Sequence, residues 1–206
     1  MYSRPTGIAI GFHGCDISTA EKVLSGKARL TPSSNDFDWL GPGIYFWEND
    51  PERALKYAAL LRDNPRRGIA KITEPYALGA VIDLGYCLNL VNSRSLEIVK
   101  QGYEMLCEMS KASGIPLPEN RKPIGEENDL LLRRLDCAVI NTIHTFNSAR
   151  KMTPYDSVRG VFWEGKDLYP NAGFKERNHI QISVVNPNCI KGYFRPLTLV
   201  DGFSNP

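Results

Sequence analysis

The chain has 206 residues, with 25 Lys or Arg against 23 Asp or Glu, so its net charge is only +2. This charge gives no overall field of the kind that marks a dedicated nucleic-acid-binding protein. The five scattered cysteines lack C-x-x-C spacing, which argues against a disulfide framework and a structural zinc site, and we expect a cytoplasmic setting. The apolar run over residues 7–12 is too short to cross a membrane. The length predicts one domain over residues 1–206.

The first predicted unit is a strand followed by a helix. Residues 8–12 form an apolar run that predicts a buried strand. Ser18 and Glu21 have the spacing of a capping box, which predicts a helix that begins near Ser18 and ends before Gly26.

A turn, a strand and a second helix follow. Two glycines and a proline in the sequence GPGIYFW indicate a sharp bend, and residues 44–47 then predict a strand. Asn49 or Asp50 is suited to cap a helix with Pro51 in its first turn. That helix carries Tyr57 on its apolar side.

The rest of the chain alternates between β-type and helical patterns. Apolar spacing predicts two helices, over residues 93–112 and 126–152, and strands over residues 77–84, 158–163, 179–185 and 189–197. These patterns predict an α+β fold with a mainly antiparallel sheet and a helical insertion over about residues 93–152.

Three segments together carry a possible chemistry: GFHG around His13, GPGIYF around Tyr45, and HIQISVV around Gln181. With them, the sequence resembles the ADP-ribosyltransferases of the diphtheria-toxin and poly(ADP-ribose) polymerase type, whose motif is H-Y-E on three strands. The resemblance is most specific over residues 8–60 and looser over residues 158–196. Alone, an H-G pair or an aromatic strand is more often structural, but their joint occurrence favours a functional reading.

The resemblance implies a split β-sheet core and a site for NAD, the ADP-ribose donor. By the family pattern, His13 would bind the adenosine ribose and the Gly14 backbone would meet the nicotinamide carboxamide. Tyr45 and Tyr57 would stack on the nicotinamide ring, beside Gly43 at the turn. Aromatic faces suit a cationic ring, and a glycine permits close approach.

The third motif position departs from the family pattern, because the segment HIQISVV contains no glutamate. Gln181 is our first candidate for this position, His179 the second and Glu176 the third. Gln181 would accept a hydrogen bond from a ribose hydroxyl but would not act as a general base. The absence of this glutamate disfavours elongation of an ADP-ribose polymer and predicts transfer of a single ADP-ribose. It also leaves open that the fold is inactive.

The resemblance further implies a macromolecular acceptor, protein or nucleic acid, and a bacterial toxin or defence role, with a possible cognate antitoxin or inhibitor. Tyr169 and Phe174, in the loop before the third strand, are candidate acceptor contacts. We expect no metal, because the His13 and Cys15 pair stands alone. Two alternatives stay open: a non-catalytic module that binds NAD or ADP-ribose, and an RNA 2′-phosphotransferase-like enzyme, which would need a cluster of basic residues.

Overall fold

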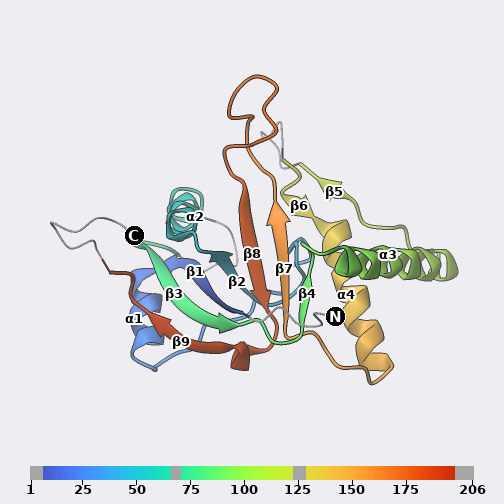
Figure 1. Ribbon diagram of the computed structural model, residues 1–206, viewed down its shortest axis with the longest axis horizontal. Coiled ribbons are helices and arrows are strands. Elements are labelled where there is room, and N and C mark those ends of the chain that lie inside the picture. Colours follow the sequence, from blue (N-terminus) through green and yellow to red (C-terminus); the bar gives the residue numbers. More distant parts are fainter. Residues whose placement is uncertain (1–6, 66–70, 123–128, 198–206) are drawn as a thin grey trace.

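The computed structural model describes residues 7–65, 71–122 and 129–197. Its centre is a seven-stranded sheet in the order β4-β7-β8-β2-β1-β3-β9 (Figure 1). All neighbouring strands in this sheet are antiparallel except β4 and β7, which are parallel. The predicted α+β class and mainly antiparallel sheet are therefore confirmed.

The elements have the following bounds. The strands of the large sheet are β1 (Ile8–Asp16), β2 (Ile44–Glu48), β3 (Pro75–Asp83), β4 (Cys87–Asn89), β7 (Ser157–Phe162), β8 (His179–Val184) and β9 (Ile190–Phe194). A separate pair consists of β5 (Asn120–Arg121) and β6 (Leu132–Arg133). The helices are α1 (Ile17–Leu24), α2 (Pro51–Asp63), α3 (Ser93–Ser113) and α4 (Arg134–Ala149), and Pro187–Cys189 is a 3₁₀ turn.

The first strand is longer than its apolar run predicts. β1 continues to Asp16 because it pairs with β3 along its whole length, from Ile8↔Asp83 to Asp16↔Pro75. The predicted end of the first strand at residue 12 is therefore too early, since His13 and Gly14 lie inside β1.

The starts of the first two helices differ in how well the sequence predicts them. The predicted Ser18 cap of α1 is wrong: Asp16 is the N-cap, and its carboxylate accepts hydrogen bonds from the Ser18 amide and hydroxyl. The predicted Asp50 cap of α2 is confirmed, because its carboxylate accepts from the Arg53 amide at 2.8 Å and Pro51 opens the first turn.

Helices cover both faces of the sheet. α1 and α2 pack on β1 and β3 from opposite faces, because alternate residues of a strand point in opposite directions. On the α1 side the core contains Phe46, Leu78, Ile82 and Ile182. The α2 side is completed by α4, which packs over β4 and β7.

The two halves of the sheet are joined by a short ladder. β1 and β2 share two residue pairs, Gly11↔Glu48 and Phe12↔Trp47, whereas β1 and β3 share nine. β1 and β2 therefore part beyond Phe12, at the position of His13.

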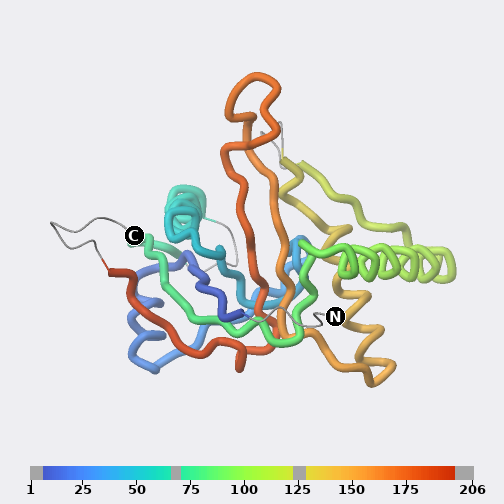
Figure 2. The backbone as a smooth tube through the Cα atoms, in the orientation of Figure 1, coloured from blue at the N-terminus to red at the C-terminus, as the bar shows by residue number. Residues whose placement is uncertain are grey.

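The region of the predicted insertion lies at one side of the sheet (Figure 2). α3 packs against α4, and only Ser95 and Gly102 of α3 are buried. The predicted helix over residues 93–112 is confirmed, but α4 begins eight residues later than predicted. Residues 132–133 pair with β5 instead, and the Asn120 side chain accepts from the Leu135 and Asp136 amides at the start of α4. Residues 123–128 lie outside the described residues.

Within the described ranges, no helix combines the length and the apolar character needed to cross a membrane.

Candidate functional site

His13 links the first two motif strands. Its Nδ1 lies 2.8 Å from the backbone carbonyl oxygen of Tyr45, and its ring lies 5.8 Å from that of Phe46. A carbonyl only accepts, so Nδ1 carries the hydrogen and Nε2 is the acceptor nitrogen of the neutral ring. Burial lowers the pKa of His13, which keeps the ring neutral near pH 7. The residues predicted as the first two of an H-Y-E pattern are thus in direct contact where β1 and β2 part.

The phenol of Tyr45 is held by local bonds. Its hydroxyl donates to the Gly41 carbonyl at 2.7 Å and accepts from the Leu40 amide at 3.0 Å. The ring packs on the α4 side of the sheet, and burial raises the pKa of the phenol. These contacts give Tyr45 a structural role in shaping the GPG turn, and its predicted stacking on nicotinamide remains a prediction.

Tyr57 lies in a different cluster. Its ring packs against Trp47 with 5.0 Å between centroids, on the face of the sheet covered by α2. Trp47 is 5% exposed, and its Nε1 has no hydrogen-bond partner within the described part of the chain. Tyr57 and Trp47 therefore form a pair of rings tilted by 48° beside α2, and sequence reasoning did not single out Trp47.

Both predicted glycines are required by close packing. A Cβ on Gly14 would lie 2.2 Å from the Ala54 carbonyl oxygen of α2, and one on Gly43 would lie 2.3 Å from the Ser183 hydroxyl. Neither position tolerates a side chain without a backbone shift. The packing of α2 on β1 therefore accounts for Gly14, and a carboxamide contact remains a prediction.

The candidates for the third position on β8, His179 and Gln181, point to the same face of the sheet as Trp47. Gln181 is half-buried and pairs in register with Trp47 and Gly160. His179 is 7% exposed, stacks on Phe162 at 5.5 Å, and has its Nδ1 2.7 Å from the Arg177 carbonyl oxygen. The structure therefore brings His179 and Gln181 to the face that carries Tyr45 and Trp47.

The third candidate, Glu176, lies away from this face. It is exposed in the loop between β7 and β8, where its carboxylate accepts a long hydrogen bond of 3.4 Å from the Lys166 amide. The position of Glu176 supports it least among the three candidates.

A buried ionic group beside His179 was missed by sequence reasoning. Glu164 is 2% exposed and accepts a hydrogen bond of 2.9 Å from Arg53 of α2, while its other oxygen has no partner among the described residues. Burial raises the pKa of the Glu164 carboxyl, and the positive charge of Arg53 opposes that effect. Arg177 pairs with buried Asp129 close by. Arg53 lies in the first turn of the predicted second helix, but nothing local identifies its partner 111 residues away.

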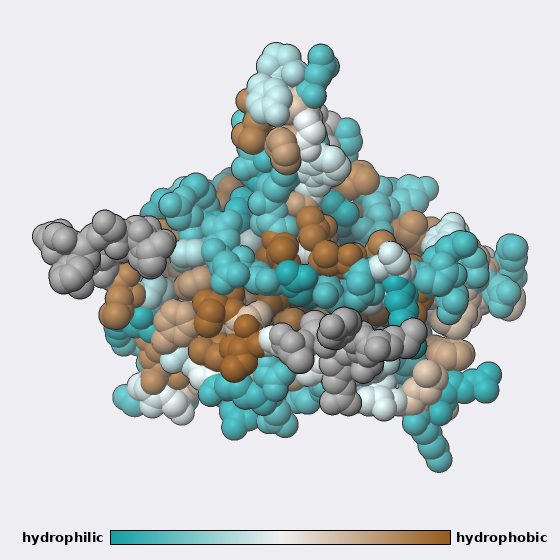
Figure 3. Space-filling view, in the orientation of Figure 1, coloured by the Kyte–Doolittle hydropathy of each residue, from teal (hydrophilic) through white to brown (hydrophobic). Residues whose placement is uncertain are grey.

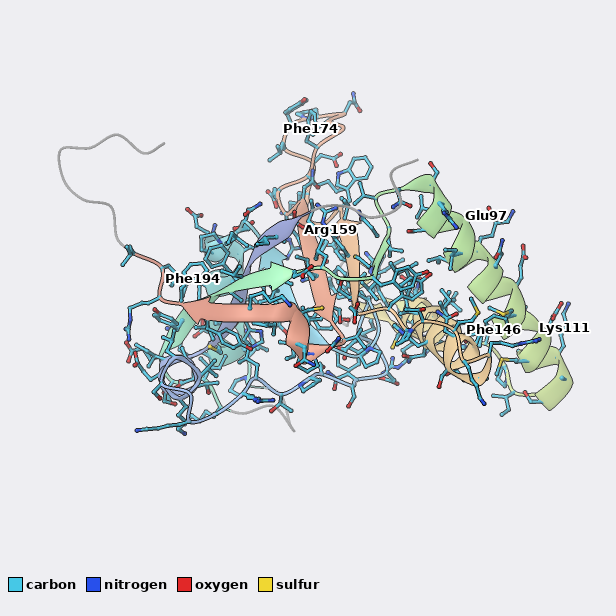
Figure 4. All side chains as sticks on the ribbon, turned by 60° about the horizontal axis from the view of Figure 1, so that its bottom comes forward. Glu97, Lys111, Phe146, Arg159, Phe174 and Phe194 are labelled. Carbon is cyan, nitrogen blue, oxygen red and sulfur yellow. The ribbon has the colours of Figure 1, made fainter. Side chains whose placement is uncertain are left out.

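The predicted acceptor contacts lie on a protruding loop between β7 and β8 (Figure 3). Tyr169 is 56% and Phe174 60% exposed, and Trp163 and Leu168 are exposed on the same hairpin. Figure 4 places Phe174 at the far end of this loop, well away from Arg159 on the sheet. The loop is thus a projection of mixed polarity with exposed aromatic side chains, next to the strand that carries His179 and Gln181.

Groups suited to a metal ion are not found among the described residues: no three His, Cys, Asp or Glu side chains come together. Two of the buried polar atoms that lack partners among the described residues, Nε1 of Trp47 and Nε2 of His179, are suited to a neutral polar ligand such as a carboxamide or a ribose hydroxyl.

Comparisons with known proteins give a distant relative and assign no family. No family model matches the chain, and no solved structure matches it. A protein of the archaeon Methanocaldococcus jannaschii, described as uncharacterized, is 25% identical over 191 residues, which cover 87% of this chain and 83% of that protein. The two chains are therefore similar over most of their lengths, and the relative's description assigns no activity.

Proposed function

We propose that the protein is an NAD-dependent mono-ADP-ribosyltransferase with a fold of the ADP-ribosyltransferase type. The observation that carries the proposal is the hydrogen bond between His13 and the Tyr45 carbonyl at the point where β1 and β2 part. β8, which bears His179 and Gln181, pairs with β2 on its other side. The three motif segments thus occupy adjacent strands although they lie far apart in the sequence.

The proposed reaction uses the bond between C1′ of a ribose and the nicotinamide ring of NAD. Nicotinamide leaves with the bonding electron pair, and a nucleophile of the acceptor forms the new bond at C1′ and loses its proton. A site that stabilises the cation-like sugar must supply oriented acceptors and aromatic surface. His179, Gln181, Tyr57 and Trp47 supply these groups on one face of the sheet.

The proposed acceptor is a macromolecule, protein or nucleic acid, and the proposed biology is a bacterial toxin or defence effector with a cognate inhibitor. The exposed hairpin loop with Tyr169 and Phe174 supports a large acceptor, because aromatic side chains on a projection are common contact residues. The biological role rests on the family resemblance alone.

A non-catalytic binder of NAD or ADP-ribose is the second candidate. It is favoured by one observation: the residues of β8 that face the site are a histidine and a glutamine, and neither carries a carboxylate. The RNA 2′-phosphotransferase-like alternative is supported less. Arg53 and Arg177 lie near the site, but each is ion-paired with a buried carboxylate, so neither is a free phosphate ligand.

The test is nicotinamide release from NAD labelled in the nicotinamide ring, with and without cell extract. In parallel, transfer of adenine-labelled ADP-ribose to macromolecules is followed. We expect release, and labelled product when extract is present. Binding of NAD without release under any condition would support the binder, and absence of binding would reject both proposals.

A further inference from the structure

We infer that Arg53 and Glu164 are positioning residues that fix the hairpin loop between β7 and β8 relative to the segment GFHG of β1, through the first turn of α2. The inference rests on the proposed function, because that function assigns the hairpin loop to the acceptor and GFHG to the donor. It adds the contact that holds these two distant segments in a set arrangement.

The hairpin loop continues the pairing of β7 and β8 beyond the sheet as a two-stranded projection (Figure 1). The Arg177 amide donates to the Glu164 carbonyl and the Glu176 amide to the Lys166 carbonyl, each at 3.0 Å. These bonds join the two sides of the loop to each other, and residues 166–171 are all exposed. The contacts that orient the loop on the rest of the molecule therefore lie at its base.

Two buried carboxylates hold the base of the loop. Glu164 is 2% exposed, and its Oε2 accepts a hydrogen bond of 2.9 Å from Arg53 of α2. Asp129, in the segment before β6, is 5% exposed and accepts from the Gly165 amide at 2.9 Å and from the Arg177 side chain. The successive residues Glu164 and Gly165 are thus held by groups from two different parts of the chain. We call the four side chains of Arg53, Glu164, Asp129 and Arg177 the clasp.

The first turn of α2 connects the clasp to GFHG. Arg53 is followed by Ala54, whose carbonyl oxygen would lie only 2.2 Å from a Cβ placed on Gly14. The Asp50 carboxylate accepts from the Arg53 amide at 2.8 Å, which fixes the start of this turn. One turn of helix therefore packs on GFHG and, through Glu164, holds the hairpin loop.

The ion pair of Arg53 and Glu164 can be removed without leaving a charge buried. Within the described ranges, Arg53 supplies the one side-chain hydrogen bond of the Glu164 carboxylate, because Oε1 is unpartnered. Loss of one partner of a buried pair strands the other charge, whereas replacement of both partners leaves none. A double variant therefore releases the loop from α2 with the least damage to the fold.

Limited proteolysis tests the clasp directly, because the exposed Lys166 is a site for trypsin on the hairpin loop. The double variant Arg53→Met, Glu164→Gln removes the ion pair, whereas Arg53→Lys keeps it. We expect cleavage after Lys166, followed by mass spectrometry, to be faster by about 10-fold or more in the double variant and by less than about 3-fold in Arg53→Lys. Glu52→Gln with Lys56→Met, at an exposed pair of the same helix, is the matched control and should change the rate by less than about 2-fold. Unchanged cleavage in the double variant would overturn the inference.

Hydrogen exchange in the unaltered protein covers the case in which the double variant fails to fold. The amides of Gly165 and Arg177 are hydrogen-bonded at the base of the loop, whereas that of Leu168 is hydrogen-bonded further out. We expect the amides of Gly165 and Arg177 to exchange at least about 10-fold more slowly than that of Leu168. Equal exchange rates would show that the base is not held, and would also overturn the inference.

The reaction itself separates this inference from the proposed function. In the double variant we expect ADP-ribose transfer to macromolecules to fall by about 10-fold more than nicotinamide release without an acceptor, because the loop is displaced rather than the donor. An equal fall in both rates would overturn the positioning role. Absence of nicotinamide release by the unaltered protein would instead reject the proposed function, and cleavage after Lys166 would then decide whether the clasp holds the loop.

Discussion

At the residue scale, the carboxylate of Asp16 joins two segments of the chain through hydrogen bonds. It accepts hydrogen bonds from Ser18 and, through its other oxygen, from the Thr73 amide at 2.7 Å, the Thr73 hydroxyl at 2.8 Å and the Glu74 amide at 3.0 Å. These bonds favour the charged form, so they lower the pKa of Asp16 far below its usual value. Asp16 thereby caps α1 and fixes the chain that enters β3.

Asp16→Asn should lower the free energy of unfolding by about 2 kcal/mol at neutral pH, because charge-assisted bonds are lost. The folded-state pKa is depressed, so the contribution is complete above the unfolded pKa of about 4 and is lost as the pH falls toward the folded value. Urea unfolding from pH 7 to pH 3 should show the wild-type and variant curves converging in acid. A constant difference over that range would contradict the account, and Asp63→Asn at an exposed pair is the control.

A second feature at the residue scale is an ion pair that spans β8 on the face opposite to His179. Arg159 of β7 and Glu48 of β2 form a two-point ion pair across β8, and both side chains are largely buried. Arg159 is in register with Ile182, so it lies on the face opposite to His179.

Arg159→Met should destabilise the fold by about 3–5 kcal/mol, because the Glu48 carboxylate would be left buried without its partner. The double variant Arg159→Met, Glu48→Gln should recover part of that loss, which a double-mutant cycle in urea measures. The exposed pair of Lys56 and Glu52 gives the comparison, and Lys56→Met should change stability by less than about 1 kcal/mol. Equal losses of stability in Arg159→Met and Lys56→Met would show that burial of the ion pair does not set its contribution.

At the scale of elements, the boundaries that depend on neighbouring residues are predictable from sequence, whereas those that depend on distant partners are not. The bend before β2 and the start of α2 follow from Gly41, Pro42 and the Asp50–Pro51 cap, all of which act within a few residues. The end of β1 differs from its prediction because β1 pairs with the distant strand β3. The start of α4 differs because the Asn120 side chain accepts from the Leu135 amide there. For the same reason the Arg53–Glu164 pair in the candidate site was not predictable from sequence.

The hairpin loop between β7 and β8 is the element we expect to meet the acceptor. Tyr169→Ser with Phe174→Ser should lower ADP-ribose transfer to macromolecules by about 10-fold or more, since exposed aromatic contacts are often worth 1–2 kcal/mol. Nicotinamide release without acceptor should change by less than about 2-fold. Leu96→Ser with Met109→Ser, at exposed apolar positions of α3, is the control. A parallel loss of both activities would show that the loop supports the site itself.

At the scale of the whole molecule, the continuous sheet links the site to every helix packed on it. α2 and α4 cover one face and α1 the other, and the candidate site lies on β2 and β8 in the middle of the strand order. The sequence predicted the class of this architecture from periodicity. The short ladder between β1 and β2 came only from the structure, because no local pattern encodes where two distant strands part.

This organisation predicts one cooperative thermal unfolding transition that NAD shifts upward. A ligand at 100 times its dissociation constant adds about 2.7 kcal/mol to the stability of the folded state, which corresponds to a rise in Tm of about 5–10 °C for a domain of this size. Differential scanning calorimetry with NAD, and with ATP as a control for non-specific polyanion binding, measures it. His13→Ala should unfold in one transition but respond less to NAD, because the link between β1 and the Tyr45 carbonyl is lost. Two separate transitions would contradict a single folding unit, whereas an equal response to ATP would remove the support for an NAD site.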